Sequence, residues 1–532
     1  MSIYFIVIYA VVAVYMLVNF KYDIQMFQQN SYRIKRYWKW LASDMGSARR
    51  LVDVALLFLI VATLLDIKLS ALIVGVTAIV KIIMMLRRKY KKPLVFTKRV
   101  WRLYAVTAAI ALGASAAVAI CTAFKEYALA YYSGPVVTIS VMLLICIFSW
   151  AVVIAANVLL MPVERMIQQR YVNDAKRILR SMPDLKVVGI TGSYGKTSTK
   201  HYLTRILSEK YDVLMTPGSF NTPMGVVRTV REYMKPYNQI FVCEMGAKQK
   251  GDIKEICDIV HPDMGIVTAV GPMHLESFKT IENVCSTKFE LVDSLPSDGV
   301  AVVNDDFAPC AAREVSNTNI VRYGVVATAN CDYRADNVKY TPEGTYFTVT
   351  GPDGFRMELY TRLLGECNVS DILAAVVIAL KLGVSPEQIK YAVAAIDQVE
   401  HRLSIKQTPG GVTILDDAFN SNPAGSKMAL DVLSHFKDGK RIVVTPGMIE
   451  LGTEQYNLNK EFGRYIGEKA DVAIIVGEYN RDAIVEGIRS TGFDTASLHE
   501  VATFNEAQTK LSAMLAKGDT ILYENDLPDT FK

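Results

Sequence analysis

The sequence has few of the residues that build metal or disulfide scaffolds. Its 532 residues include 8 cysteines and 6 histidines, and no two cysteines form a C-x-x-C pair. This spacing excludes a zinc ribbon and a disulfide framework and is typical of a protein from a reducing compartment. Internal repeats and low-complexity segments are also absent, and 51% of the residues are hydrophobic. An intrinsically disordered or collagen-like chain is therefore excluded.

Positive and negative charges are distributed unevenly along the chain. Residues 1–184 hold 23 Lys and Arg against 8 Asp and Glu, whereas residues 185–532 hold 35 against 45. The two parts have formal charges of +15 and −10, in agreement with +5 for the whole chain. A basic, apolar first part followed by an acidic second part indicates a membrane anchor joined to a soluble region. The acidic region is a poor partner for nucleic acid.

Five apolar stretches predict a multi-pass helical membrane domain over residues 1–165. They cover residues 2–19, 51–65, 69–86, 103–124 and 135–160. A helix of about 20 residues crosses the hydrocarbon core of a bilayer, which is about 30 Å thick. The first stretch could also be a signal peptide. It has no Lys or Arg before its apolar core and no small-residue cleavage site, so we expect it to remain as a span.

Basic residues between the apolar stretches predict their orientation. Residues 20–50 carry seven Lys and Arg, and residues 87–102 carry eight, whereas the connections 66–68 and 125–134 carry one each. Because Lys and Arg in short loops stay on the cytoplasmic side, we expect five crossings of the plasma membrane and cytoplasmic catalytic domains. The lipid bilayer is then the first expected partner. The basic loops either only set this topology or also attract anionic lipid headgroups.

Short β-branched runs alternate with amphipathic helical patterns from residue 186 onward, which predicts an α/β fold with a largely parallel sheet. Strands are expected at 186–191, 240–245, 264–270 and 299–304, within the interval 331–360, and in a second series at 411–418, 441–447, 472–478 and 520–525. The soluble part is expected to divide near Arg402. The predicted domains are a nucleotide-binding domain over residues 166–402 and a smaller α/β domain over residues 403–532.

A phosphate-binding loop is predicted at GSYGKTSTK, residues 192–200, because a predicted strand precedes it and a helical pattern follows it. Glycines allow backbone amides to approach phosphate oxygens, and Lys196 is expected to neutralise the β and γ phosphates of ATP. Thr197 is expected to place its hydroxyl on Mg²⁺. A chance GKT in an ordinary loop is the alternative. The predicted nucleotide-binding residues here are Gly192, Ser193, Tyr194, Gly195, Lys196, Thr197 and Ser198.

The loop resembles the ATP-binding loop of the Mur ligases, which build the peptide stem of peptidoglycan. Other motifs follow in the order of that family: NTPMGV (221–226), EMGA (244–247), GPMHLESF (271–278), STKFEL (286–291), LLGECNVSDILAA (363–375), EHRL (400–403), DDAFNSNPAGS (416–426) and PGMIELG (446–452). Together they cover residues 186–532 and most resemble the member that adds D-alanyl-D-alanine. The resemblance implies a central ATPase domain and a Rossmann-like C-terminal domain. It also implies an enzyme that phosphorylates a carboxylate with ATP, after which an amine attacks the acyl phosphate.

The resemblance implies metal-binding roles for three residues outside the loop. Glu244 would hold Mg²⁺ together with Thr197, and His274 would bind a second Mg²⁺. Lys288 matches the lysine that most members carry as a carbamate, an anion able to help hold metal or substrate. The alternatives are a strand-end salt bridge for Glu244, a structural role for His274 and an uncarbamylated Lys288 that holds phosphate.

The resemblance also implies residues around the nucleotide and the reaction centre. Asn368 would face the nucleotide, and Arg402 would contact phosphate when the domains close over ATP. Asp417, in the motif that also contains Asn420, would face the reaction centre, with a buried turn network as the alternative. The family's usual histidine and second asparagine are replaced by Cys367 and Asp371.

Two larger departures from the family pattern concern the substrates. Five predicted spans stand where Mur ligases carry a UDP-binding domain, and ILYENDLPDTFK (521–532) stands in place of a K-G-S-R type segment. We therefore expect a carboxylate on a lipid-linked or membrane-proximal cell-wall precursor, and an amino acid or dipeptide as the amine. An ATP-driven transporter or NTPase, a ligase for another envelope polymer and a silent scaffold are the alternatives. The scarcity of polar residues in the spans disfavours a transporter.

Overall fold

The computed structural model describes residues 3–44, 47–61, 66–88, 90, 93–124, 134–326, 329–341, 344–419 and 421–526. Sequence predictions that fall wholly or partly outside these ranges include the end of the apolar run 51–65, the connection 125–134, Asn420, and the end of the 521–532 tail. The chain forms two compact units, Met1–Gln169 and Arg170–Leu527.

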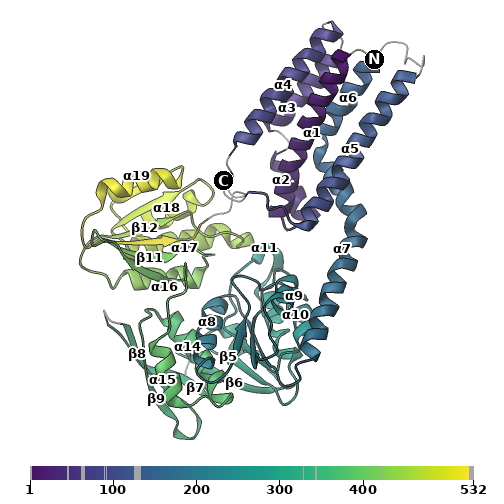
Figure 1. Ribbon diagram of the computed structural model, residues 1–532. Helices are drawn as coiled ribbons and strands as arrows, with labels where there is room; N and C mark the ends of the chain where they lie inside the picture. The colour runs from purple at the N-terminus through teal and green to yellow at the C-terminus, as the bar shows by residue number, and fades with distance from the viewer. Residues whose placement is uncertain are drawn as a thin grey trace. The chain divides into compact units, whose positions relative to one another are not determined.

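The first unit is a bundle of helices, most of them apolar (Figure 1). It contains α1 (Ile3–Gln29), α2 (Ile34–Asp44), α3 (Ala48–Val61), α4 (Ile67–Arg87), α5 (Lys98–Phe124), α6 (Gly134–Ile147) and the first part of α7 (Ser149–Arg180). Among the described residues, α1, α4, α5 and α7 are long and apolar enough to cross a membrane, judged by length and composition. The described part of the run 51–65 lies in α3, which has 14 residues. The run 135–160 is divided between α6 and α7 instead of forming one helix.

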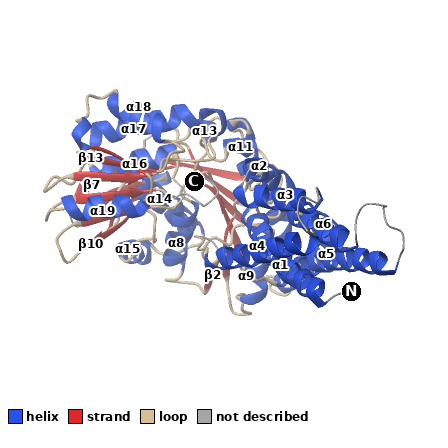
Figure 2. Cartoon of the chain, turned by 90° about the horizontal axis from the view of Figure 1, so that it is seen from above, coloured by secondary structure: helices blue, strands red, loops and turns tan. Residues whose placement is uncertain are grey.

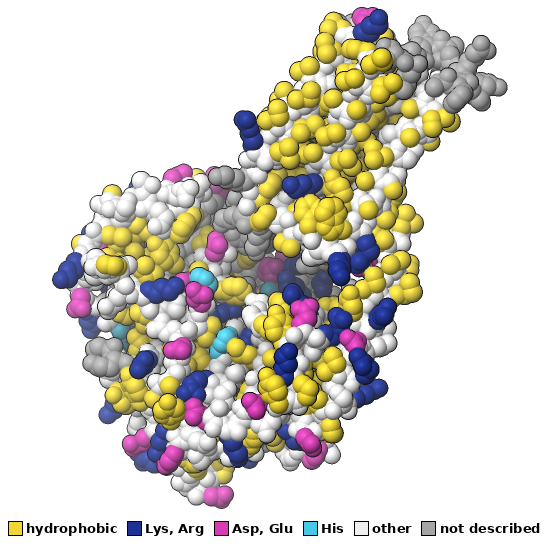
Figure 3. All heavy atoms as spheres, viewed as in Figure 1, with side chains coloured by type: hydrophobic (Ala, Val, Ile, Leu, Met, Phe, Trp, Pro, Cys, Tyr) yellow, Lys and Arg dark blue, Asp and Glu magenta, His cyan; other side chains and the backbone are white. Residues whose placement is uncertain are grey.

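Hydrophobic side chains cover the visible face of the first unit (Figure 3). Leu51, Phe58, Met84 and Leu159 are each more than half exposed, although all are large and apolar. A continuous apolar surface of this kind is unfavourable in water and marks a surface that contacts lipid or another protein.

Charged side chains are also buried between the helices of the first unit. The ammonium of Lys81 in α4 lies 2.6 Å from Oδ1 of Asp53 in α3, and the hydroxyl of Tyr15 in α1 donates to Oδ2 at 2.8 Å. Arg49 in α3 donates to Oδ1 of Asn19 in α1 at 2.7 Å. Asp53 and Lys81, which are distant in the sequence, therefore form one buried ion pair that links α1, α3 and α4.

The second unit contains two sheets. The strands of the first sheet are β1 (Lys186–Thr191), β2 (Val213–Met215), β3 (Ile240–Glu244), β4 (Met264–Val267), β5 (Val300–Asn304), β6 (Asn319–Gly324), β7 (Tyr333–Thr341), β8 (Gly344–Thr350) and β9 (Arg356–Thr361). Their order is β2-β3-β1-β4-β5-β6-β7-β8-β9. Neighbours from β2 to β7 are parallel, and β8 pairs antiparallel with both β7 and β9. The carboxyl ends of β1, β3 and β4 therefore meet at one edge.

Helices cover both faces of this sheet. One face packs against α8 (Lys196–Leu207), α14 (Glu366–Lys381) and α15 (Pro386–Ala394), and the other against the end of α7, α9 (Pro223–Glu232), α10 (Asp252–Val260) and α12 (Ile281–Phe289). Three short helices complete the layer: α11 (Leu275–Phe278), α13 (Ala308–Ala311) and the 3₁₀ turn η1 (Val292–Ser294). The turn η2 (Pro352–Gly354) joins β8 to β9.

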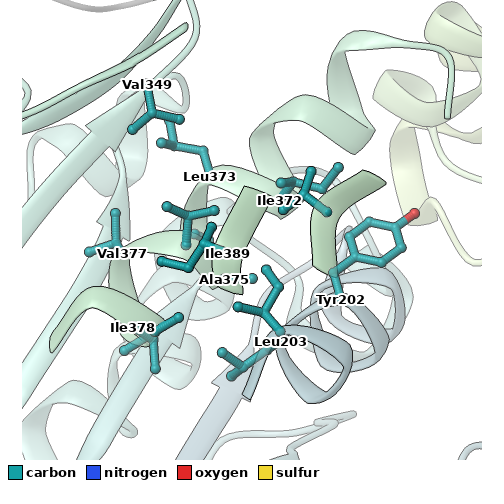
Figure 4. Close-up of a cluster of buried hydrophobic side chains, with 14 of the residues drawn as sticks. Tyr202, Leu203, Val349, Ile372, Leu373, Ala375, Val377, Ile378 and Ile389 are labelled. Atoms are coloured by element: carbon teal, nitrogen blue, oxygen red, sulfur yellow. The ribbon is translucent and has the colours of Figure 1, made fainter. Parts of the chain in front are cut away.

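Helix α14 is enclosed by other elements of this core (Figure 4). Figure 4 shows Ile372, Leu373 and Val377 of α14 beside Tyr202 of α8 and Val349 of β8. A helix that is apolar on all sides is stable only when it is buried in this way. The close packing of α14 on α8 fixes the helix that follows the phosphate loop.

The second sheet forms the C-terminal α/β region. Its strands are β10 (Ser404–Gln407), β11 (Thr413–Asp417), β12 (Arg441–Thr445), β13 (Val472–Val476), β14 (Leu498–Val501) and β15 (Thr520–Glu524). Their order is β10-β11-β15-β12-β13-β14, and within the described part of this sheet only the pair β10–β11 is antiparallel. In Figure 2, α16 (Pro423–Leu433), α17 (Gln455–Lys469) and α18 (Arg481–Arg489) lie on one side of the strands, and α19 (Phe504–Met514) on the other. The turns η3 (Gly452–Glu454) and η4 (Thr495–Ser497) lie in its loops.

Candidate active site

The predicted phosphate loop connects β1 to α8, and glycine is required at two of its positions. Gly195 caps α8 with a φ of 76°. A Cβ on Gly195 would lie 2.2 Å from Oδ1 of Asp371, and a Cβ on Gly192 would lie 2.0 Å from Oγ1 of Thr268. Only glycine fits in these places, so the loop amides remain accessible to a phosphate group at the helix N-terminus. The loop and first turn contain the predicted residues Gly192, Ser193, Tyr194, Gly195, Lys196, Thr197 and Ser198.

Hydrogen bonds join this loop to the segment that follows β4. The hydroxyl of Ser193 donates to the carbonyl of Gly271 at 3.2 Å, and the amide of Gly271 approaches the same hydroxyl at 3.1 Å. The hydroxyl of Tyr194 lies 3.4 Å from the carbonyl of Pro272. The segment that carries His274 is therefore held beside the phosphate loop.

Lys196 and Thr197 occupy the first turn of α8. The ammonium of Lys196 donates to the carbonyls of Gly192 at 2.6 Å and Ser193 at 3.1 Å, so its side chain folds over the loop. Burial lowers the pKa of Lys196 to about 8, against the opposing influence of Glu244. A phosphate group at the loop would favour the charged form of this lysine.

Glu244 is a buried carboxylate at the end of β3, with 1% of its surface exposed. Its Oε1 accepts from Asn221 at 2.9 Å and from Thr197 at 3.3 Å, and its Oε2 lies 3.0 Å from the ammonium of Lys200. Burial alone would raise the pKa of Glu244, but Lys200 and Lys196 outweigh it and lower the pKa below its usual value. The carboxylate is therefore ionised and directed at the first turn of α8.

The oxygens of Thr197 and Glu244 fit Mg²⁺, which prefers hard oxygen donors at the edge of a phosphate site. The two side chains come from different elements, yet they approach to 3.3 Å. Within the described part of the chain, no group of three His, Cys, Asp or Glu forms a closed metal cage. Mg²⁺ needs no such cage, because phosphate oxygens and water complete its coordination.

His274 precedes α11, and Lys288 lies in α12, which packs on the opposite face of the sheet from α8. His274 caps α11 in a left-handed conformation, with a φ of 54°, and its Nδ1 contacts Oε2 of Glu450. Burial lowers the pKa of His274 although Glu450 opposes the shift, which favours a neutral imidazole. Lys288 in α12 is 3% exposed, and burial followed by the charge of Lys196 lowers its pKa well below the usual value. The neutral amine is the form that reacts with carbon dioxide.

Asn368 and Asp371 are buried in α14 beside α8. The amide of Asn368 is engaged at both ends, because its Oδ1 accepts from the hydroxyl of Tyr202 at 2.6 Å and its Nδ2 donates to the carbonyl of Leu364 at 2.8 Å. Oδ1 of Asp371 accepts from the hydroxyl of Thr199 at 3.0 Å. Burial raises the pKa of Asp371 to about 8, so near neutral pH this carboxyl is largely protonated. It then resembles the asparagine that the family pattern predicts at this position.

A cavity of about 500 Å³ adjoins the first turn of α8 and is large enough for part of a nucleotide. Thr197 and His201 of α8 line this cavity. Gln398, Arg402 and Phe419, which follow α15 in the chain, line it as well. The guanidinium of Arg402 lies 4.6 Å from the centre of the Phe419 ring and donates to the Phe419 carbonyl at 3.1 Å. The structure therefore brings Arg402 and Thr197 to the same cavity.

Asp417 holds the segment that links the two sheets. Its Oδ1 accepts from the amide of Leu403 at 3.0 Å, next to Arg402. Asp417 and Glu524 are partners in the register of β11 and β15, and Glu524 is fully buried whereas Asp417 is partly buried. Burial raises the pKa of both carboxyl groups, most strongly that of Glu524, which also contacts Ser421. A proton on Glu524 lets this carboxyl pair exist without two adjacent charges.

Several residues with contacts in this region were not predicted from the sequence, among them four with charged or amide side chains. Lys200, Asn221 and Glu450 lie inside the quoted motifs GSYGKTSTK, NTPMGV and PGMIELG, so motif position was the available signal. Glu524 lies in the tail that departs from the family pattern, and no sequence signal indicated its partner.

Comparison with known proteins places both sheets in one family. Residues 190–379 match the Mur ligase middle domain, and residues 401–523 match the Mur ligase, glutamate ligase domain. The UDP-N-acetylmuramoyl-tripeptide–D-alanyl-D-alanine ligase of Bacillus subtilis (strain 168) is 30% identical over 344 residues, which cover 64% of this chain and 72% of that enzyme.

Solved structures show the same relationship. MurF from Acinetobacter baumannii superposes with a TM-score of 0.60 and 26% identity, covering 68% of this chain and 77% of its own. The MurF ligase from Thermotoga maritima, solved in complex with ADP, gives a TM-score of 0.59 and 26% identity over 68% of this chain and 80% of its own. The predicted α/β fold and the predicted enzyme class are confirmed. This chain belongs to the Mur ligase family of ATP-dependent acid–amino-acid ligases.

Proposed function

We propose that this protein is a membrane-anchored Mur ligase that completes a cell-envelope precursor at the cytoplasmic face of the plasma membrane. The family membership already assigns ATP-dependent ligation in peptidoglycan precursor synthesis. The observation that carries the proposal is the meeting of Lys196, Thr197 and Glu244 at one phosphate loop in a chain with an apolar helical unit.

Residues of the loop bind and orient ATP in this proposal. Amides of residues 192–197 hold phosphate oxygens, and the Lys196 ammonium neutralises charge on the β and γ phosphates. Thr197 and Glu244 would hold Mg²⁺, which supplies positive charge to the phosphate oxygens when bound. Arg402 reaches the same cavity from the C-terminal side and would add a second cationic group.

The reaction forms one amide bond and cleaves one phosphoanhydride bond of ATP. An oxygen of the substrate carboxylate attacks the γ-phosphorus, and ADP leaves. The amine then attacks the activated carbonyl carbon, and the C–O bond breaks so that the carboxylate oxygen departs with orthophosphate. Most of the acceleration in such chemistry comes from positioning and charge neutralisation, which fits a site built from Lys196, Thr197, Glu244 and Arg402.

We also propose roles for His274 and Lys288 as catalytic residues, and for Asn368 and Asp417. His274 would bind a second Mg²⁺, and Lys288 would carry a carbamate that helps hold metal or substrate. The lowered pKa of Lys288 supports this modification, because carbon dioxide adds only to a neutral amine. Asn368 would lie beside the nucleotide, and Asp417 would fix the segment that carries Arg402.

The substrates are proposed from the relatives and from the first unit. The Bacillus subtilis relative is named for UDP-N-acetylmuramoyl-tripeptide and D-alanyl-D-alanine, so we propose an amino acid or dipeptide of this kind as the amine. The apolar helices stand where the family has its UDP-binding domain. This favours a carboxylate on a lipid-linked or membrane-proximal precursor over a freely diffusing UDP sugar peptide.

A bilayer location is supported by the surface of the first unit. Four of its described helices are long and apolar enough to span a membrane, and large hydrophobic side chains are exposed around them (Figure 3). The proposed domains are a membrane domain over residues 1–165, an ATP-binding domain over 166–402 and a C-terminal domain over 403–532. The two compact units divide after Gln169, which supports an end of the membrane domain near residue 165.

Isotope tracing tests the proposed reaction directly. Full-length protein in nanodiscs is given ATP, a dipeptide and a precursor whose carboxylate contains oxygen-18. We expect labelled orthophosphate and amide product only when both substrates are present, no turnover for Lys196→Ala, and normal turnover for the exposed control Lys437→Ala. ADP release without the amine would instead indicate a pump or an idle NTPase. Equal turnover of UDP-linked and lipid-linked precursors would refute the substrate preference but not the ligase.

A further inference from the structure

His274 and Glu450 are joined although 175 residues separate them in the sequence. Nδ1 of His274 contacts Oε2 of Glu450, and the two side chains are 17% and 18% exposed. His274 belongs to the ATP-binding region, whereas Glu450 lies in the loop between β12 and η3 of the C-terminal region. The contact therefore connects two separate parts of the second unit.

The backbone around the two residues is closely fitted. The amide of Glu276 donates to the carbonyl of Glu450 at 3.3 Å. A Cβ on Gly452, where φ is 64°, would lie 3.2 Å from the carbonyl carbon of Leu275. His274 and Glu450 both have left-handed backbones, with φ of 54° and 63°. Non-glycine residues keep this unfavourable conformation only when surrounding contacts hold it, so the pair is a built feature and not a chance surface contact.

The chemistry of imidazole determines what this contact does. A carboxylate can only accept a hydrogen bond, so the proton of a neutral His274 lies on Nδ1. Nε2 then has a free lone pair directed away from Glu450. In metal sites a carboxylate commonly fixes the tautomer and orientation of a ligating histidine in this way, and its loss typically weakens metal affinity about 10- to 100-fold.

We propose that Glu450 is a positioning residue that orients His274 for binding of a divalent cation, so that the cation site depends on the C-terminal region. The inference rests on the proposed role of His274 and adds a residue from another part of the fold. The hydrogen bonds of Ser193 with Gly271 hold the segment that carries His274 beside the phosphate loop. The contact between Glu450 of the PGMIELG loop and His274 would then be needed to form the cation site.

Binding of Mn²⁺ to the full-length protein with a non-hydrolysable ATP analogue tests the proposal. Pulsed electron paramagnetic resonance detects nitrogen-14 coupling when an imidazole nitrogen binds Mn²⁺. We expect this coupling in the wild type and its loss in His274→Ala. Glu450→Ala should lose most of the coupling and bind this Mn²⁺ about 10- to 100-fold more weakly. Glu450→Gln should retain much of both, because its amide oxygen can still accept from Nδ1.

Glu454→Ala is the matched control, because Glu454 is an exposed acid in the adjoining turn η3. Thermal melting checks that each variant is folded. Should Glu450→Ala fail to fold, Glu450→Asp gives the same test, since it keeps the charge but withdraws the carboxylate by one methylene group. Wild-type coupling and affinity in folded Glu450→Ala or Glu450→Asp would overturn the proposal, as would a wild type without nitrogen coupling. In either case, preserved ATP-dependent ligation would leave the proposed function standing.

Discussion

The ammonium of Lys200 lies 3.0 Å from Oε2 of Glu244, and both side chains are almost completely buried. The same ammonium donates to the carbonyl of Gly218 at 2.7 Å. Lys200 therefore fixes one oxygen of Glu244 and leaves the other directed at Asn221 and Thr197. Removal of one partner from a buried ion pair leaves an uncompensated charge, which is more damaging than loss of the pair as a whole.

Lys200→Met is expected to destabilise the catalytic unit by about 3–5 kcal/mol, because Glu244 would remain buried without its counter-ion. The pKa of Glu244 would rise, and turnover would need a higher Mg²⁺ concentration. Thermal melting and the Mg²⁺ dependence of ligation check this expectation. The exposed Lys437→Met should stay within about 0.5 kcal/mol of the wild type. Equal stability of the two variants would contradict the role given to Lys200.

Gly195→Ala is expected to abolish nucleotide binding, because the new Cβ would meet Oδ1 of Asp371 at 2.2 Å. Gly251 provides a matched control, since it also caps a helix in a left-handed conformation but has no atom within 4 Å of a built Cβ. Gly251→Ala should carry only the conformational strain, about 1–2 kcal/mol. Calorimetric titration with ADP distinguishes them. Similar ADP affinities for both variants would show that the contact with Asp371 is unimportant.

Asp371→Asn is expected to change how stability depends on pH. Burial raises the pKa of Asp371 to about 8, so the folded protein holds a proton that the unfolded chain releases near its ordinary value. This stabilisation is complete below the unfolded pKa and is lost as pH rises toward about 8, by roughly 1.4 kcal/mol per pH unit. Asn cannot ionise, so the melting temperature of the variant should rise relative to wild type across this window. A difference independent of pH would contradict the raised pKa.

Lys81→Met is expected to destabilise the first unit by about 3–5 kcal/mol, because Asp53 would remain buried without its partner. The double variant Asp53→Leu with Lys81→Met should recover most of this loss, since an apolar pair leaves no buried charge. Thermal unfolding in detergent micelles measures both. The loss of stability in the double variant is compared with the losses in Lys81→Met alone and Asp53→Leu alone. If the loss in the double variant equalled the sum of the two, Asp53 and Lys81 would not be the coupled pair that the structure shows.

The sequence predicted those parts of the fold whose signal is local. β1, β3, β4 and β5 are buried on both faces, so they appear as short, mostly apolar runs rich in Val and Ile. β2 has only three partly buried residues, and β10 is a polar edge strand that pairs on one side, so neither has such a run. The phosphate loop was likewise recognisable, because strand, glycines and helix are adjacent in the chain.

Features that depend on distant residues were not predicted. The apolar run 135–160 gives no sign of the break between α6 and α7, where Asn19 donates to the carbonyl of Cys146 at 2.9 Å. The pairs Lys200–Glu244 and His274–Glu450 depend on the packing of separate elements, so residue type alone could not indicate them. Glu244, His274 and Lys288 came from family motifs rather than from spacing, and their proposed roles still await the experiments above.

The enclosure of Lys288 also restricts its chemistry as a nucleophile. An uncharged amine attacks electrophiles, but only 3% of this side chain reaches solvent. Bulky labelling reagents such as succinimidyl esters should leave Lys288 untouched while they modify surface lysines. Cyanate is small and linear like carbon dioxide, and it should add to the same nitrogen irreversibly. On the proposed role of Lys288, cyanate is expected to inactivate the enzyme through this lysine, and an excess of bicarbonate is expected to protect it.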